Sequence, residues 1–363
     1  MKLRIATRKS ALALAQTTMA ADAIVAANSA SNADSLTYEL VSMTTEGDRR
    51  LDKSLASFGG KGVFIKELEI ALLENRADIA IHSLKDMPAE VLPEFKLAAV
   101  LKREDPRDAF LSRGGAAGIK FMDLPTGARI GTGSIRRVVQ LKALRPDLEY
   151  VPIRGNIQTR IGKLAELDGV VLAAAGLKRM GLADQVTEYF STEQMLPASG
   201  QGILAIETLS ANDGPYRCSL QGDNNERNSN VILEERSDDR IHEIATIAEF
   251  LSRANDHETF CVASAEMAYL KALNAGCQFP VASFAEFICR DSCGSCDNGD
   301  ETSRSPNFES AKTLKIRGIY WDEKSSRLLR ADVSGSVDLA SADSVQQSKN
   351  LGIALAQEIK KQL

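Results

Sequence analysis

Cysteine is scarce in this chain and absent from its first 217 residues. Six cysteines in 363 residues, all in the C-terminal part, do not form the pattern of a disulfide framework. Long apolar runs are also missing, since no stretch approaches the roughly 20 apolar residues of a membrane span. The apolar stretch at residues 11–15 is shorter than the roughly 7 to 15 residues of a signal-peptide core. We therefore expect a cytoplasmic protein with reduced thiols and no membrane partner.

The chain also lacks a strong net charge of either sign. Its formal charge is -5 and its pI is about 5.5, so the whole molecule offers no electrostatic footprint for nucleic acid. Hydrophobic residues make up 44% and charged residues 26%, which excludes collagen-like, coiled-coil and wholly disordered chains. The length predicts two or three domains, and any basic site must be local.

Short apolar strands alternate with helical patterns through the first 210 residues, and this alternation predicts α/β sheets. In the first unit we expect Ser10 to cap a helix. A second unit follows the polar stretch 102–108, and a strand at 203–206 could return to the first. The expected strands are residues 3–6, 37–43, 79–83, 129–131, 149–153, 170–174 and 203–206; the expected helices are 11–27, 63–75, 135–144 and 157–167.

The last third of the chain combines two polar insertions with a further unit. Residues 211–230 are rich in turn formers and predict a loop or insertion, as does the segment 289–312. The remaining expected elements are helices at 241–251, 263–273 and 345–361 and strands at 281–288 and 313–320.

Basic residues concentrate between Arg129 and Arg160. This segment has seven basic residues against Asp147 and Glu149, on a chain that is acidic as a whole. The motifs GTGSIRR and RGNIQTR each fall where a strand gives way to a helix, and ligands of open α/β sheets bind at such strand ends. Arginine binds carboxylate or phosphate through two parallel hydrogen bonds. The pattern predicts a ligand with several negative charges; the alternative is that these arginines solvate a helix surface.

Asp86 follows an apolar strand and precedes Pro88, in the motif IAIHSLKDMP. A carboxylate at the carboxyl end of a strand is well placed for acid/base chemistry or for stabilising a cation. The alternative is an aspartate that shapes a turn. We interpret His82, in the same motif, as a packed strand residue rather than a catalyst.

Two cysteine patterns could carry chemistry. Cys277 lies on a glycine turn in NAGCQFP, where a thiol could be accessible and nucleophilic or simply a small buried residue. Cys289, Cys293 and Cys296 have the spacing of three iron–sulfur ligands. No further Cys or His follows them, so a closed zinc site would need a distant fourth ligand. We expect no bound metal.

Ordered motifs across the chain resemble the hydroxymethylbilane synthase, or porphobilinogen deaminase, family. They are RIATRKSALALAQ, GGKGVFIKELEIALLENRADIAIHSLKDMP, REDPRDAF, GTGSIRR, RGNIQTR, AAGLKRMGL, PASGQG and NAGCQFP. The resemblance implies an α/β fold of three domains, of which the first two are similar to type II periplasmic binding proteins and the third is a small α+β domain. We expect domain 1 at 1–102 and 200–245 with an insertion at about 211–240, domain 2 at 103–199, and domain 3 at 255–363 with an insertion at about 289–312.

The resemblance also implies an activity. Members of the family are transferases that condense four porphobilinogen molecules head to tail, with release of ammonia, into the linear tetrapyrrole hydroxymethylbilane. Their primer is a dipyrromethane cofactor, which a thioether would hold on Cys277. Each ring carries an acetate and a propionate, so the local arginines would suit the growing chain. The family resemblance further favours a monomer.

Roles for individual residues follow from matching the family motifs. Asp86 corresponds to the catalytic aspartate and also contacts the cofactor. The other cofactor-binding positions would be Ser10, Lys61, Ser134, Arg136, Arg137, Arg154 and Gly155, and the substrate-binding positions Arg8, Arg154, Arg160, Arg179 and Gln201.

The sequence departs from the family at a few positions. Ser57 stands where some members have a lysine, Gly133 replaces a hydroxyl residue, and both insertions are additional. Two other interpretations stay open: a non-catalytic two-lobed protein that binds a small anion, and a redox or iron–sulfur protein built on the cysteine triplet.

Overall fold

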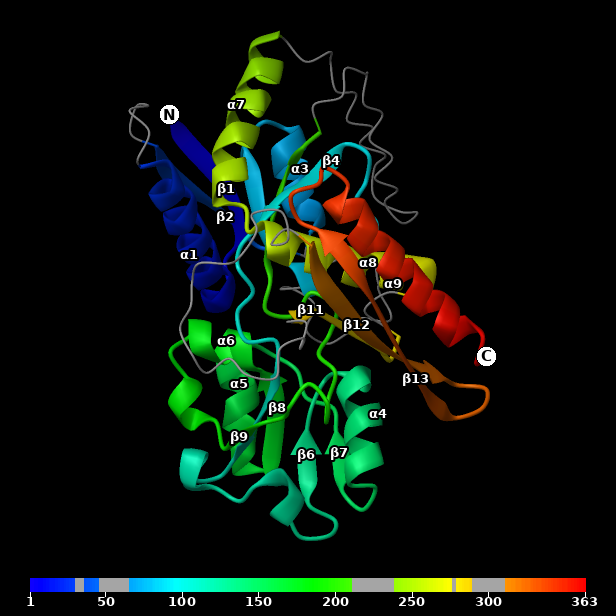
Figure 1. Cartoon of the computed structure of the whole chain (residues 1–363). Coiled ribbons are helices and arrows are strands. Elements are labelled where there is room, and N and C mark those ends of the chain that lie inside the picture. The colour runs from blue at the N-terminus through cyan, green and yellow to red at the C-terminus, as the bar shows by residue number, and fades with distance from the viewer. Residues whose placement is uncertain (30–35, 46–64, 211–237, 276–278, 289–310) are drawn as a thin grey trace, which may run out of the picture.

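The computed structural model describes residues 1–29, 36–45, 65–210, 238–275, 279–288 and 311–363. Three β-sheets, each with its own helices, make up this part of the chain, which is an α/β fold with a small α+β unit at its C-terminal end (Figure 1). Within these residues, no helix is both long and apolar enough to cross a membrane.

The first sheet has the strand order β2-β1-β3-β10-β4. Strands β1, β2 and β3 are parallel, and β10 pairs antiparallel with both β3 and β4. The strand expected near residues 203–206 is therefore a return of the chain into this sheet. The strands are β1 (Lys2–Arg8), β2 (Thr37–Met43), β3 (Ile79–Ser83), β4 (Phe95–Val100) and β10 (Leu204–Leu209).

Helices cover both faces of the first sheet. On one face α1 (Ala11–Asn28) and α7 (Asp238–Ala254) pack on Leu3 and Ile5, and on the other α3 (Lys66–Leu73) packs on Ala6 and Ala80. Ser10 caps α1 as predicted, because its Oγ accepts a hydrogen bond from the backbone N–H of Ala13. Helix α3 ends before the expected Asn75, which has a left-handed φ of 56° and so cannot continue it.

The second sheet has the order β7-β6-β8-β5-β9, with β6, β7 and β8 parallel and β5 antiparallel to β8. Strand β7 is shorter than expected because Pro152 follows it and has no N–H to donate. The strands are β5 (Asp108–Ser112), β6 (Arg129–Gly131), β7 (Glu149–Val151), β8 (Gly169–Ala173) and β9 (Glu188–Tyr189).

Three short helices flank the second sheet: α4 (Ile135–Leu144), α5 (Ile157–Gly162) and α6 (Ala174–Arg179). The helix expected to reach residue 167 changes to a 3-10 turn after Gly162. The rings of Phe110, Phe121 and Phe190 pack edge to face in the core beside α4. The 3-10 turns of the described residues are Leu84–Asp86, Gly115–Ala117, Phe121–Asp123, Lys163–Ala165 and Ala183–Gln185.

The third sheet is an antiparallel meander on which two helices pack. Sequence reasoning missed its edge strand β13, whose polar residues alternate along an open face. The elements are α8 (His257–Ala272), β11 (Val281–Ile288), β12 (Ala311–Asp322), β13 (Arg327–Asp338) and α9 (Ser344–Lys360).

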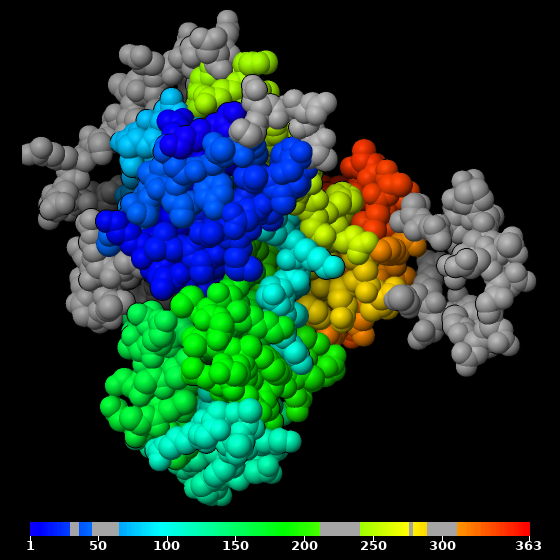
Figure 2. Space-filling model, turned by 90° about the vertical axis from the view of Figure 1, so that its left-hand side faces the viewer, coloured from blue at the N-terminus to red at the C-terminus, as the bar shows by residue number. Residues whose placement is uncertain are grey.

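Two crossing segments, residues 101–107 and 190–203, connect the first two lobes, which meet at a waist in the space-filling view (Figure 2). Both segments converge on Glu266 of α8, which is fully buried. Its carboxylate accepts hydrogen bonds from Arg103 Nη1 (2.7 Å), the Gly200 N–H (2.6 Å) and the Ala285 N–H of β11 (2.8 Å). One carboxylate therefore joins both crossings to the third sheet.

We predict that Glu266→Gln destabilises the protein by about 3–5 kcal/mol, because it leaves Arg103, whose side chain is only 12% exposed, without its counter-charge. Urea unfolding measures the change. The control is Glu258→Gln on the same helix, which breaks an exposed pair with Lys312 and should cost no more than about 1 kcal/mol. Equal midpoints for the two variants would contradict the prediction.

Candidate functional site

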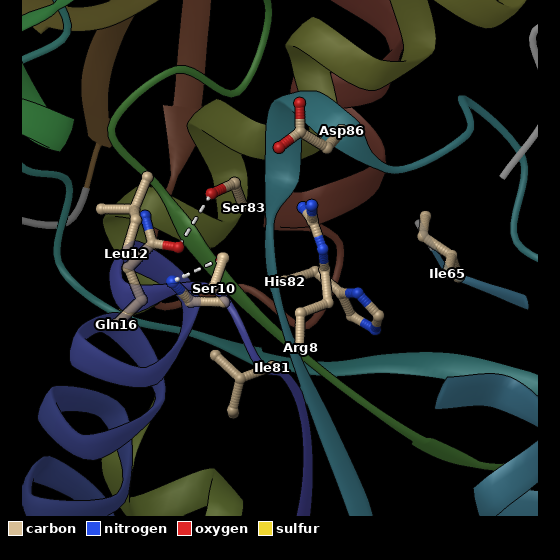
Figure 3. Close-up of a pocket in the computed structure, with 10 residues that line it drawn as sticks. Arg8, Ser10, Leu12, Gln16, Ile65, Ile81, His82, Ser83 and Asp86 are labelled. Atoms are coloured by element: carbon tan, nitrogen blue, oxygen red, sulfur yellow. Dashed lines mark hydrogen bonds between the residues drawn. The ribbon is translucent and has the colours of Figure 1, made fainter. Parts of the chain in front are cut away.

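A pocket opens at the carboxyl ends of the parallel strands β1 and β3, as the sequence analysis expected for ligands of this fold. Its lining includes Arg8, Ser10, His82 and Asp86. In Figure 3 the Arg8 side chain extends from the end of β1 toward the Asp86 carboxylate. Ser10 also caps α1, so its hydroxyl oxygen already accepts one hydrogen bond.

Asp86 ends a 3-10 turn that follows β3, and its side chain is exposed. The strand before it is buried, and the turn places this carboxylate beyond the core, in the lining of the pocket. Beside it lies Lys85, which sequence reasoning missed although the motif contains it. Burial lowers the pKa of Lys85, while the charge of Asp86 opposes that change.

Arg136 and Arg137 lie in the first turn of α4, and both are buried, with 5% of each residue exposed. They bind opposite oxygens of Asp108, which opens β5: Arg136 Nη2 lies 2.8 Å from Oδ2, and Arg137 Nη2 lies 2.8 Å from Oδ1. The interpretation that they only solvate a helix surface is therefore wrong. Two guanidinium groups share one carboxylate, which leaves an excess positive charge at the start of α4.

Asp108 stays ionised at neutral pH. Burial alone would raise its pKa, but Arg136 and Arg137 hold the pKa at about 2. Sequence reasoning missed Asp108, because one aspartate in the charged motif REDPRDAF has no distinguishing local signal. Ser134 occupies the N-cap position of α4, and its hydroxyl makes no capping hydrogen bond.

The loop before α5 adds further basic groups. Gly155 has a φ of 105°, and its carbonyl accepts a 2.7 Å hydrogen bond from Arg160 Nε, while the Arg154 side chain is exposed. Burial and the charges of Arg137 and Arg154 lower the pKa of Arg160, and Asp86 raises it. Basic groups of the second lobe thus lie within electrostatic reach of the carboxylate of the first.

Two further predicted substrate contacts lie at the crossing segments. Arg179 Nη2 donates a 2.7 Å hydrogen bond to the carbonyl of Gly202, and burial lowers its pKa. Gln201 is 1% exposed and its amide bonds to protein groups of both lobes. Gly133 lies where a Cβ would be 2.6 Å from the Ile153 carbonyl, so close packing accounts for glycine at this position.

Several predicted positions lie outside the described residues. These are Ser57, Lys61, Cys277 and the cysteine triplet Cys289, Cys293 and Cys296. Among the residues that are described, no group of three or more His, Cys, Asp or Glu side chains could hold a metal ion.

One residue of the pocket lining, His82, forms a buried pair with a carboxylate. His82 Nε2 lies 3.0 Å from Oε2 of Glu207 on β10, so the packed strand histidine that we expected has a carboxylate partner. Glu69 of α3 is also buried in this region. Burial raises its pKa to about 8, with further contributions from the charges of Glu207 and Glu94.

Family models match most of the chain. Residues 3–215 match the model "Porphobilinogen deaminase, dipyromethane cofactor binding domain", and residues 260–361 match "Porphobilinogen deaminase, C-terminal domain". The curated relatives include proteins named porphobilinogen deaminase from Syntrophus aciditrophicus and Sorangium cellulosum. The first is 40% identical over 98% of this chain and 94% of the relative, and the second 38% identical over 99% of both.

Two solved structures show a distant likeness in fold. A TRAP periplasmic solute binding protein from Roseobacter denitrificans with bound β-D-glucuronate has a TM-score of 0.36, with 11% identity over 76% of this chain and 87% of that one. The periplasmic VFT2 domain of Bordetella pertussis BvgS has a TM-score of 0.32, with 11% identity over 57% of this chain and 80% of that one.

The raised pKa of Glu69 predicts a pH-dependent stability. Between pH 4.5 and 8 the folded chain keeps a proton on Glu69 that the unfolded chain loses, so this group makes the folded state less stable as the pH rises through that window. Glu69→Gln should therefore raise the melting temperature more at pH 8.5 than at pH 5. Glu74→Gln, at an exposed position of the same segment, is the control. A gain that is equal at both pH values would count against this reading.

Proposed function

The chain belongs to the porphobilinogen deaminase family, and from that premise we propose that it is a hydroxymethylbilane synthase with Asp86 as its catalytic residue. It would condense four porphobilinogen molecules in turn on a covalent primer and release ammonia at each step. The observation that carries the assignment of the site is the exposed carboxylate of Asp86 facing a cluster of buried and half-buried basic groups.

The charge of the cleft fits a ligand that gains carboxylates. Among the described residues, Arg8 lines the pocket with Asp86, its only carboxylate. Lys85 and Arg160 interact electrostatically with Asp86, and Arg154 lies within electrostatic reach of Arg160. The pair Arg136 and Arg137 adds further positive charge that Asp108 neutralises only in part. Arginine and lysine in a half-buried cleft bind carboxylates more strongly than they do in water.

Asp86 is the residue that can act on the reacting atoms. When the C–N bond of porphobilinogen breaks, the electron pair leaves with the nitrogen and a cation remains on the pyrrole. The Asp86 carboxylate stabilises this cation and accepts hydrogen bonds from pyrrole N–H groups. A carbon of the terminal ring of the growing pyrrole chain then forms a C–C bond with this cation. The proton displaced from that ring carbon can pass to the same carboxylate.

The same cleft suits a dipyrromethane with its acetate and propionate groups. Ser134, with a hydroxyl that makes no capping bond, and the exposed Arg154 are the described groups that could hold it, beside Arg136 and Arg137. When bound, the cofactor supplies the primer ring that is extended. Its proposed attachment at Cys277 and contact at Lys61 rest on the family resemblance, since both lie outside the described residues.

The remaining proposals concern the whole molecule. The three sheets support the division into 1–102 with 200–245, 103–199 and 255–363, although α7 continues the first unit to Ala254. We propose a cytoplasmic monomer without nucleic-acid or membrane partners, in tetrapyrrole biosynthesis. The anion-binding alternative is not favoured, because it gives no role to Asp86.

Replacing Asp86 tests its catalytic role. Asp86→Asn keeps the shape of the side chain but loses the charge and the proton acceptor, so turnover of porphobilinogen should fall at least about 100-fold while the melting temperature stays near that of the wild type. Asp184→Asn, at an exposed position of the second lobe, should keep full turnover. Near-normal turnover by Asp86→Asn would show that the residue is misassigned.

The mass of the intact protein tests the covalent cofactor. Purified wild-type protein should exceed the mass calculated from its sequence by two linked pyrrole units, and should turn pink with Ehrlich's reagent. The added mass should be absent from Cys277→Ser and present in Cys261→Ser, which changes a buried thiol of α8 that faces Ser344 and Ser348 of α9. An unmodified mass in active wild-type protein would exclude the covalent primer.

A further inference from the structure

Gln201 lies on the returning crossing segment and touches both lobes. Its Nε2 donates to Asp108 Oδ1 of the second lobe (3.0 Å) and to the Pro106 carbonyl of the outgoing segment (2.7 Å). Its Oε1 lies 3.5 Å from Nζ of Lys85 in the first lobe. Both ends of one amide are thus bound to protein, and the residue is 1% exposed.

The glycines on either side fix the backbone that presents this amide. Gly200 and Gly202 have φ values of 75° and 91°, which favour glycine. A Cβ at Gly200 would lie 3.0 Å from the backbone nitrogen of Lys85, and one at Gly202 would lie 2.3 Å from the Glu104 carbonyl oxygen. The returning segment therefore runs against the turn that carries Lys85 and Asp86, and Gln201 has little freedom to move.

Gln201 joins a charged group of the first lobe, Lys85, to a charged group of the second, Asp108. Asp108 Oδ1 already accepts two hydrogen bonds from Arg137, at 3.0 and 2.8 Å, and Gln201 supplies a third. Lys85 precedes Asp86 directly. A neutral amide can satisfy an anion with its N–H groups and a cation with its oxygen at the same time, without adding charge of its own.

We propose that Gln201 is a positioning residue rather than a residue that binds substrate. It holds the Lys85 ammonium beside Asp86, at a fixed position relative to the cluster formed by Asp108, Arg136 and Arg137. The effect on kcat that we expect rests on the proposed function, whereas the contacts of Gln201 do not. Because Gln201 acts through Lys85 and Asp108, its loss should impair the chemical step more than substrate binding.

The kinetic test compares Gln201→Met with Gln140→Met in holoenzyme whose loading is checked by intact mass. Gln140 is an equally buried glutamine, and its bonds within the described residues go to backbone groups of Leu196 and Arg136. We expect Gln201→Met to lower kcat about 10-fold or more with KM within about twofold, and Gln140→Met to lower the melting temperature only. A raised KM at unchanged kcat would assign Gln201 to substrate binding, and unchanged kinetics would leave it a purely structural role; either result overturns the proposal.

A second measurement tests the contact between Gln201 and Lys85 and needs no activity assay. Gln201→Glu places a carboxylate next to Lys85, so acetylation of Lys85, followed by peptide mass spectrometry across pH, should have its midpoint at a pH about 1 higher than in the wild type. Gln140→Glu should leave the midpoint unchanged. If the midpoint does not move in Gln201→Glu, the bridge is excluded. A wild-type protein that makes no product would refute the proposed function and leave this measurement valid.

Discussion

The placement of the two lobes depends on one buried carboxylate. Glu266 comes from the third domain, yet it binds Arg103 of the outgoing segment and the Gly200 N–H of the returning one. The Arg103 guanidinium also lies over the Phe284 ring at 4.8 Å and donates to the Gln201 carbonyl. Since these segments connect the lobe that carries Asp86 to the lobe that carries Arg136, Arg137 and Arg160, a contact outside the pocket helps to fix how these groups face one another.

The buried charge of Asp108 has two effects on the arginines beside it. Asp108 is enclosed with two arginines, and such an arrangement costs desolvation energy that only close pairing offsets. The pairing keeps both guanidinium groups rigid at the start of α4. It also leaves their positive charge only partly neutralised, which suits a ligand that carries several carboxylates.

Local patterns in the sequence predicted much of the first two lobes. Strand β3 and helix α4 were predicted with the observed bounds, because a buried apolar strand and a helix with an amphipathic face follow from neighbouring residues alone. Strand β13 was not, since its polar residues are held by pairing with β12 rather than by burial. For the candidate site, the position of Asp86 after β3 agrees with its place in the pocket lining. Asp108 and Lys85 were missed because their roles arise from contacts with Arg137 and Gln201, which are distant in sequence.

The position of β10 has a consequence for the order in which the protein can form during synthesis. Residues 108–189 contribute every strand of the second sheet as one continuous stretch, so that lobe can close as soon as the ribosome has released it. The first sheet begins with residue 2, but β4 pairs only with β10 among its strands and must wait for residues 204–209. Of these two lobes, the one that is synthesised first is therefore the second to complete its sheet.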